Sequence, residues 1–246
     1  MNNILITGGS GYVGSRLTFK LLENNRNINV IVNYDLSLFG DNHLPLKNKK
    51  YKYIKQDIRN LDQYENALRK YQIDTVIHLA CISNDPSYVL NEKLSRSINY
   101  DCFENLVIKS KKNGVKKFIY ASTSSVYGVS ESPNVTEEHP LKPITDYNKY
   151  KGLCEPLLKK HLDKNFTGII IRPATVCGYS EKMRFDLTVN ILTNFAYHKK
   201  FIKVFGGKQF RPNIHIDDMC DLYEYLIDNN FIDNDFNEIN GQIFNA

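Results

Sequence analysis

Residues 4–14, ILITGGSGYVG, decide the fold of this 246-residue sequence. Three apolar residues in a row predict a short buried strand, and the apolar spacing over residues 16–23 predicts a helix just beyond the glycines. Glycine permits the tight strand-to-helix turn and lets the backbone come close to a pyrophosphate. Free N–H groups at the start of the helix then face the negative charge. The stretch therefore predicts a phosphate-binding turn.

Two glycine patterns, G-x-G-x-x-G and G-x-x-G-x-x-G, overlap within residues 8–14. Either one serves the same purpose, because each combines a tight turn with a close approach of the backbone to the ligand. The alternative interpretation is an ordinary turn rich in glycine. The strand before the turn and the helix after it favour cofactor binding. We expect contacts with the pyrophosphate from Gly8, Gly11, Tyr12, Val13 and Gly14.

An acidic residue, Asp35, follows the second predicted strand, residues 30–32, and lies about 20 residues beyond the last glycine, as in dinucleotide-binding proteins. A carboxylate at this place accepts hydrogen bonds from the ribose hydroxyls and repels a 2′-phosphate. The alternative is a surface aspartate without a ligand. The sequence thus favours NAD over NADP as the cofactor.

Apolar runs alternate with helical patterns through the first two thirds of the sequence. Continuous apolar strands of this kind are buried on both faces, which predicts an α/β fold with a doubly wound parallel sheet. The expected strands after residue 32 cover 51–54, 75–79, 117–121 and 168–171, and the expected helices cover 61–71, 94–112 and 147–162. Beyond residue 172 the pattern loosens. We therefore divide the chain into a nucleotide-binding domain, 1–172, and a smaller lobe interleaved with it, 173–246.

Composition excludes several classes of protein. Lys and Arg number 32 and Asp and Glu 27, and this excess of +5 is spread along the chain, which suits an anionic small ligand better than nucleic acid. The five cysteines are widely spaced without C-x-x-C, which indicates free thiols in a reducing compartment. No His or Cys spacing indicates a metal site. Without a signal peptide or a run of about 18 apolar residues, we expect a cytoplasmic protein that does not enter membranes.

A candidate catalytic pair occurs in the pattern Y-x-x-x-K, formed by Tyr147 and Lys151. Residues four apart share one face of a helix, so the lysine ammonium can lie near the phenol and lower its pKa. A shift from near 10 to near 7 requires about 4 kcal/mol. The hydroxyl-rich run of residues 121–128 leaves a predicted strand at its carboxyl end, where doubly wound sheets bind ligands. Alone, each pattern is also typical of a solvated helix or a capped loop.

Taken together and in this order, the motifs resemble those of the extended short-chain dehydrogenases/reductases of the nucleotide-sugar epimerase/dehydratase family. The resemblance covers nearly the whole chain and implies a Rossmann sheet that binds NAD. It places the catalytic hydroxyl four residues before the tyrosine of V-Y-G, at Thr123. It therefore implies a triad of Thr123, Tyr147 and Lys151, with the last two also contacting the cofactor.

Further motifs extend the resemblance along the chain. D-I-R at residues 57–59 resembles an adenine-contacting motif, H-L-A-C at 78–81 one that lines the pyrophosphate, and R-P at 172–173 one near the nicotinamide. These motifs imply additional cofactor contacts from Asp57, Ile58, Leu79, Ala80, Asn99 and Pro173. Arg211, in R-P-N-I-H-I-D-D, matches an arginine that contacts the nucleotide diphosphate. Arg184 is a second candidate substrate contact, with a surface salt bridge as its alternative.

Two positions after Thr123 bear on the reaction. Related dehydratases carry an acidic residue there, whereas this chain has Ser124 and Ser125. This argues against dehydration, and the preference for NAD indicated by Asp35 then favours epimerisation of a nucleoside-diphosphate sugar through a 4-keto intermediate, because epimerases retain and recycle NAD. Reduction of a nucleotide-linked 4-keto sugar, or NAD binding without catalysis, are the alternatives.

The resemblance also implies a quaternary structure and a short second lobe. Two helices, 94–112 and 147–162, carry apolar residues on more than one face, as expected where a helix has a second packing partner. They match the helices through which the family forms homodimers, so we expect a homodimer. Relatives continue well beyond the G-x-x-F-N strand at residues 241–245, so the substrate lobe is expected to be shortened at its C-terminal end.

Overall fold

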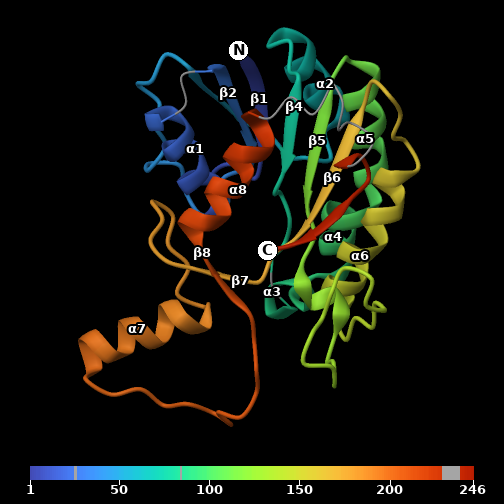
Figure 1. Ribbon diagram of the computed structural model, residues 1–246. Helices are drawn as coiled ribbons and strands as arrows, with labels where there is room; N and C mark the ends of the chain where they lie inside the picture. Colours follow the sequence, from blue (N-terminus) through green and yellow to red (C-terminus); the bar gives the residue numbers. More distant parts are fainter. Residues whose placement is uncertain (25–26, 84, 229–238) are drawn as a thin grey trace.

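The computed structural model describes residues 1–24, 27–83, 85–228 and 239–246. Within these ranges, seven parallel strands form one sheet in the order β3-β2-β1-β4-β5-β6-β9 (Figure 1). The strands are β1 (Asn2–Thr7), β2 (Ile28–Asp35), β3 (Tyr51–Lys55), β4 (Thr75–His78), β5 (Lys117–Ala121), β6 (Thr167–Arg172) and β9 (Ile243–Asn245). The order changes direction at β1 and β4, as the doubly wound prediction requires.

Helices cover both faces of this sheet, as predicted. Successive strand residues point to opposite faces, so Ile4 and Ile6 of β1 pack with α1 (Tyr12–Asn24) and α8 (Ile216–Asp228). Leu5 packs on the other face with α2 (Leu61–Lys70), α5 (Phe103–Lys112) and α6 (Asp146–Lys159). Because helices cover both faces of the sheet, the strands are continuous apolar runs in the sequence.

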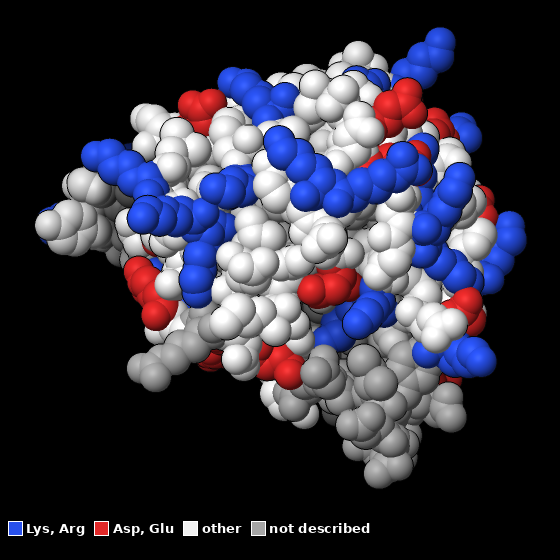
Figure 2. Space-filling view, turned by 90° about the horizontal axis from the view of Figure 1, so that it is seen from above, with Lys and Arg blue, Asp and Glu red and all other residues white. Residues whose placement is uncertain are grey.

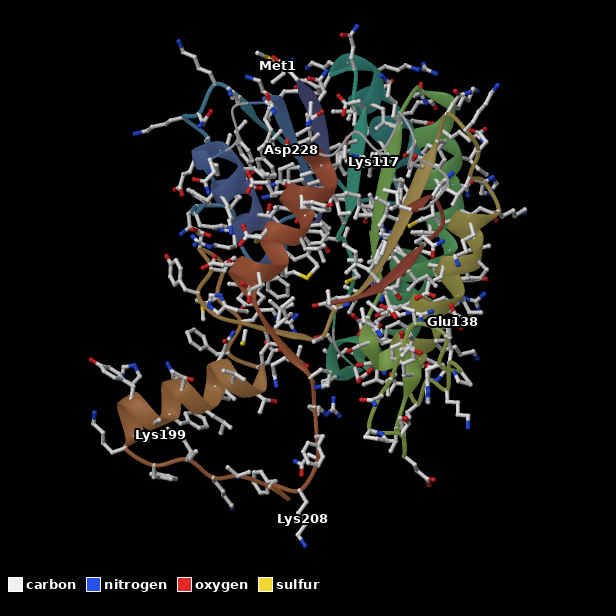
Figure 3. The ribbon with its side chains drawn as sticks, viewed as in Figure 1. Met1, Lys117, Glu138, Lys199, Lys208 and Asp228 are labelled. Atoms are coloured by element: carbon white, nitrogen blue, oxygen red, sulfur yellow. The ribbon has the colours of Figure 1, made fainter. Side chains whose placement is uncertain are left out.

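The elements after residue 172 fall into two groups. Helix α8 and strand β9 complete the sheet and its helical layer, and β9 confirms the strand expected from G-x-x-F-N. Strands β7 (Thr175–Cys177) and β8 (Asn213–His215) instead pair with each other. Between them, α7 (Thr188–Lys199) and the following loop project from the body as an arm, with Lys199 and Lys208 far from the sheet (Figures 1 and 3).

The helix predicted over residues 94–112 is not continuous. After α3 (Asp85–Leu90), the chain forms α4 (Glu92–Arg96), a π-helical turn at Ser97–Asp101 and then α5. A π turn accommodates an extra residue in the helix and turns side chains away from their regular positions. Here it contains Asn99, which is buried against the loop after β4. A contact distant in sequence thus breaks the helical period.

Charged side chains are spread over the face at the amino ends of the strands. Figure 2 looks down on this face and shows Lys and Arg across its width with Asp and Glu among them. The phosphate-binding turn lies at the opposite, carboxyl end of the sheet. In the described ranges, no helix combines the length and the apolar character needed to cross a bilayer.

Candidate active site

A cavity of about 830 Å³ opens at the carboxyl ends of the parallel strands. The glycine turn after β1 and the end of β2 line one part of it, and the loops after β4 and β5 line another. The start of α6 and the segment after β6 complete the wall. Ligands bind at this edge in doubly wound sheets because the chain crosses to opposite faces there and leaves a crevice. The cavity is therefore the candidate active site.

Two glycines of the turn, Gly8 and Gly14, have no room for a side chain. Gly8 has φ +76°, and a Cβ there would lie 2.7 Å from the backbone nitrogen of Ala80. A Cβ on Gly14 would press on the Gly8 carbonyl oxygen and lie 2.6 Å from the Cα of Gly9. The backbone itself therefore forms the cavity wall at the start of α1, as a pyrophosphate-binding turn requires.

The carboxylate of Asp35 lies at the cavity wall beside the glycine turn. Its Oδ2 accepts a hydrogen bond from the Ser10 backbone nitrogen at 3.0 Å, and its Oδ1 accepts one from the Ser37 backbone nitrogen at 2.6 Å. Burial raises the pKa of this carboxyl, while the two backbone hydrogen bonds oppose the rise. Each carboxylate oxygen has a second lone pair with which it can accept a hydrogen bond from a hydroxyl.

Most of the predicted cofactor contacts meet in this one cavity. Its wall includes, besides the residues of the glycine turn and Asp35, the residues Asp57, Ile58, Leu79, Ala80 and Pro173. Asp57 also binds the guanidinium of Arg59 through both oxygens, at 2.6 and 3.0 Å. This ion pair lowers the pKa of the Asp57 carboxyl and orients it at the cavity edge.

Asn99 has a different place from the one predicted. Its side-chain amide accepts a hydrogen bond from the Ile82 backbone nitrogen at 2.8 Å and donates one to the Ile82 carbonyl at 3.0 Å. It is buried and does not belong to the described cavity wall, whereas its neighbour Ile98 does. Asn99 therefore holds the loop after β4 in place from behind.

Thr123, Tyr147 and Lys151 come together at the cavity wall, although they derive from two different elements. Thr123 ends the extended segment after β5, and its Oγ1 accepts a hydrogen bond from the Ser125 backbone nitrogen at 3.2 Å. Tyr147 and Lys151 lie one turn apart in α6, which begins after the side chain of Thr145 caps it. The Lys151 ammonium donates to the Ala121 carbonyl oxygen and lies 4.8 Å from the centre of the Tyr120 ring.

The electrostatics at Tyr147 differ from the prediction that Lys151 lowers its pKa. Burial raises the pKa of the Tyr147 phenol well above its usual range, and the acidic groups of Cys81 and Asp85 raise it further. The cation that opposes this rise is the Arg184 guanidinium. Removing water from around the phenol disfavours the charged phenolate, and the ammonium of Lys151 is engaged by a backbone carbonyl instead.

The two arginines predicted to bind substrate lie in different surroundings. Arg184 lines the cavity and is ion-paired with Asp186, with Nη2 and Oδ2 2.6 Å apart, so the salt bridge is present and the substrate contact stays a prediction. It donates a further hydrogen bond to Ser83 Oγ at 3.0 Å. Arg211 is exposed in the loop between α7 and β8, away from the described cavity wall.

Sequence reasoning missed several residues of the site. Cys81 lines the cavity beside Tyr147, and its only signal was a cysteine where the resembling motif has Ala or Gly. Ser10 and Ser37 orient Asp35 through their backbone nitrogens, which no side-chain motif reveals. Among the described residues, no group of three or more His, Cys, Asp or Glu could hold a metal ion.

These residues fit a dinucleotide. The glycines of the turn line the cavity without side chains, so the backbone there can approach a pyrophosphate. The carboxylate of Asp35, beside that turn, suits ribose hydroxyls. Thr123, Tyr147 and Lys151 line the same cavity, and the strand that leads to Thr123, β5, lies on the other side of β1 and β4 from β2, which carries Asp35. One ligand can therefore contact both groups of residues.

Comparison with known proteins agrees with this geometry. Residues 4–240 match the model of the NAD-dependent epimerase/dehydratase family, and the chain belongs to this family. It is 29% identical to a dTDP-D-glucose 4,6-dehydratase of Dictyostelium discoideum, over 96% of this chain and 58% of that protein. It is 29% identical to a putative UDP-glucose 4-epimerase of Methanocaldococcus jannaschii, over 88% of this chain and 70% of that one.

A solved structure with the same fold is the UDP-glucose 4-epimerase of Thermotoga maritima, determined with UDP-glucose. It superimposes with a TM-score of 0.83 at 25% identity. The superposition covers 100% of this chain and 76% of the Thermotoga chain. The chain thus spans little more than half the length of the Dictyostelium relative and three quarters of the Thermotoga structure.

Proposed function

We propose that the protein uses NAD to epimerise a nucleoside-diphosphate sugar at C4 through a transient 4-keto intermediate. The observation that carries the proposal is the meeting, in one cavity, of the glycine turn and Asp35 with Thr123, Tyr147 and Lys151. The first group suits a dinucleotide and the second suits proton transfer to and from a hydroxyl. Similarity to nucleotide-sugar epimerases and dehydratases supports the substrate class.

The chain's own residues have distinct tasks in this mechanism. NAD, when bound, supplies the acceptor and later the donor of the hydride. The backbone of the glycine turn holds the pyrophosphate, and Asp35 binds the adenosine ribose. Tyr147, as phenolate, takes the proton from the sugar O4 and returns it at the end. Thr123 holds that oxygen by a hydrogen bond, and Lys151 contributes positive charge beside the site.

Proton transfer at Tyr147 follows from its surroundings. A phenol with a raised pKa is a weak proton donor and, once ionised, a strong base, so Tyr147 takes the O4 proton readily only where nearby cations stabilise the phenolate. Arg184 and Lys151 supply cations at the same cavity wall. Each half of the cycle therefore uses one protonation state of the same side chain.

Epimerisation is favoured over dehydration by the two positions after Thr123. Ser124 and Ser125 begin a short 3-10 helix and line the cavity, so hydroxyls stand where the related dehydratases have an acid. Asp35 favours epimerisation over reduction, because an epimerase recycles NAD within the site whereas many reductases consume NADPH. A reductase and a non-catalytic NAD-binding protein are the outcomes that the test must separate.

We also propose that the protein forms a homodimer through α4, α5 and α6. Leu94, Ile108 and Leu153 are each about 40% exposed on these helices. Tyr150 of α6 lies close to Tyr100, with ring centroids 5.2 Å apart, and adds an aromatic surface. Two-fold pairing of such helices would cover these side chains.

The decisive experiment is a turnover assay with UDP-, GDP- and CDP-sugars without added cofactor. Formation of the C4 epimer supports the proposal. Activity only on 4-keto sugars, with stoichiometric loss of NADH, identifies a reductase. Tyr147→Phe should lower kcat by ~10² or more while NAD still binds. The control is Tyr150→Phe, three residues along α6 and outside the described cavity wall, which should keep normal turnover. Equal rates for the two variants would refute the role of Tyr147.

A further inference from the structure

A buried ion pair lies behind the catalytic cavity. Arg172, the last residue of β6, binds Glu155 of α6 through two hydrogen bonds, Nη2 to Oε2 at 2.6 Å and Nε to Oε1 at 3.0 Å. Their side chains are only 3% and 4% exposed. Replacing such a pair by apolar residues is often neutral or stabilising, so stability alone does not account for its presence.

The same pair holds both ends of the segment that contains Thr123. At one end, Ser122 Oγ donates a hydrogen bond to Glu155 Oε1 at 2.6 Å, and Ser122 is itself buried. At the other end, Arg172 Nη1 donates to the Tyr127 hydroxyl at 2.7 Å. Thr123 lies between these two attachments, at the cavity wall.

The pair also belongs to the helix that carries the other two catalytic candidates. Glu155 follows Lys151 by one helical turn in α6, on the same side of the helix. Side chains on one helix face keep a fixed spacing, so whatever Glu155 holds is placed relative to Tyr147 and Lys151. The hydrogen bond from Ser122 Oγ to Glu155 joins the segment just before Thr123 to α6.

We propose that Ser122, Glu155 and Arg172 form a positioning unit that sets Thr123 in register with Tyr147 and Lys151. Its catalytic consequence rests on the proposed epimerase function. The physical reason is that proton transfer needs donor and acceptor within hydrogen-bond reach, and a displacement of about 1 Å can cost ~10² in rate. A carboxylate that is hydrogen-bonded on both oxygens inside the protein has little freedom to move.

Ser122→Ala tests the unit without leaving a charge unpaired, because Glu155 keeps its two bonds to Arg172. The matched control is Ser110→Ala in α5. Ser110 is equally buried, and its Oγ donates to the Leu106 carbonyl at 2.7 Å and bonds to the Tyr64 hydroxyl at 2.7 Å. The same hydroxyl is lost in both variants, but only one loss lies next to the cavity.

Hydrogen exchange on the unliganded full chain is the first measurement, and it needs no turnover. Peptides covering residues 123–128 should exchange about tenfold faster in Ser122→Ala, the factor expected for a lost hydrogen bond to a charged group, and at the unchanged rate in Ser110→Ala. Unchanged exchange in Ser122→Ala, or an equal increase in both variants, would overturn the proposal even if no sugar is turned over.

A double-mutant cycle is the second measurement once turnover is established. Ser122→Ala should lower kcat about tenfold with the KM for the sugar and the Kd for NAD unchanged. In a Thr123→Ala background the same change should cost nothing more, because Ser122 acts through Thr123. A full tenfold loss in both backgrounds would overturn the positioning role, and so would wild-type kcat in the single variant. Absence of epimerisation in the wild-type chain would reject the proposed function and leave the exchange result to decide the positioning unit.

Discussion

The substitution Gly14→Ala probes the phosphate-binding turn where the backbone of Gly14 packs closely against the backbone of Gly8 and Gly9. The added methyl group would press on the Gly8 carbonyl oxygen and lie 2.6 Å from the Cα of Gly9. Neither atom can rotate away, so the turn itself has to shift. Overpacking of this kind costs about 1–3 kcal/mol, against a gain of about 1 kcal/mol from replacing glycine within a helix. We expect a net loss of stability of up to about 2 kcal/mol.

A second glycine provides the matched control. Gly152 lies inside α6, and a Cβ there would meet Val126 Cγ1 at 3.5 Å and Leu141 Cδ1 at 3.6 Å, ordinary contact distances. Gly152→Ala should therefore gain the helix-forming advantage of about 1 kcal/mol without a clash. The two variants carry the same chemical change and should move stability in opposite directions.

Thermal unfolding and NAD titration measure the two effects. At about 2–4 °C per kcal/mol for a chain of this size, Gly14→Ala should lower the Tm by several degrees and Gly152→Ala should raise it by about 2–4 °C. Because the shifted turn is the proposed pyrophosphate site, Gly14→Ala should also weaken NAD binding by about tenfold or more. A Gly14→Ala chain that is as stable as wild type and binds NAD equally well would refute the steric reasoning.

Three further predictions address the cofactor, the pH dependence and the assembly. Asp35→Asn should narrow the preference for NAD over NADP, because it removes the charge that repels a 2′-phosphate. Calorimetric titration gives the ratio of the Kd for NADP to the Kd for NAD, and the same ratio in wild type and variant would contradict this. Arg184→Gln removes the cation that lowers the pKa of the Tyr147 phenol, so the phenolate forms only at higher pH. The rising limb of the pH profile of kcat for sugar oxidation should therefore move to higher pH. A limb that stays in place or moves to lower pH argues against this pairing. Light scattering at micromolar concentration should show wild type as a dimer and Leu153→Glu as a monomer, because burying an unpaired charge in an apolar interface is costly. A monomeric wild type would contradict the proposed homodimer.

The properties that the sequence by itself determined are those that depend on neighbours in the chain. The glycine turn needs only residues 4–14, and the shared helix face of Tyr147 and Lys151 needs only a spacing of four. Apolar runs bounded by turns determine a strand buried on both faces. These local patterns also place Thr123 at the carboxyl end of a strand, so the cavity could be predicted as the common edge of several strands.

The tertiary structure decided which partner each polar side chain takes. Asn99 bonds to the Ile82 backbone and breaks the predicted helix with a π turn, although nothing in the local pattern distinguishes it from a ligand contact. Lys151 donates to the Ala121 carbonyl, so burial controls the pKa of Tyr147 and raises it.

The ion pair of Glu155 with Arg172 joins a helix to the neighbouring strand and holds Ser122, 33 residues earlier than Glu155 in the chain. Hydrogen bonds and desolvation act over a few ångströms in space, whatever the separation in sequence. Residue spacing along one helix or strand therefore predicts a shared face, while the choice of partner across elements is settled only when the sheet and its helices pack together.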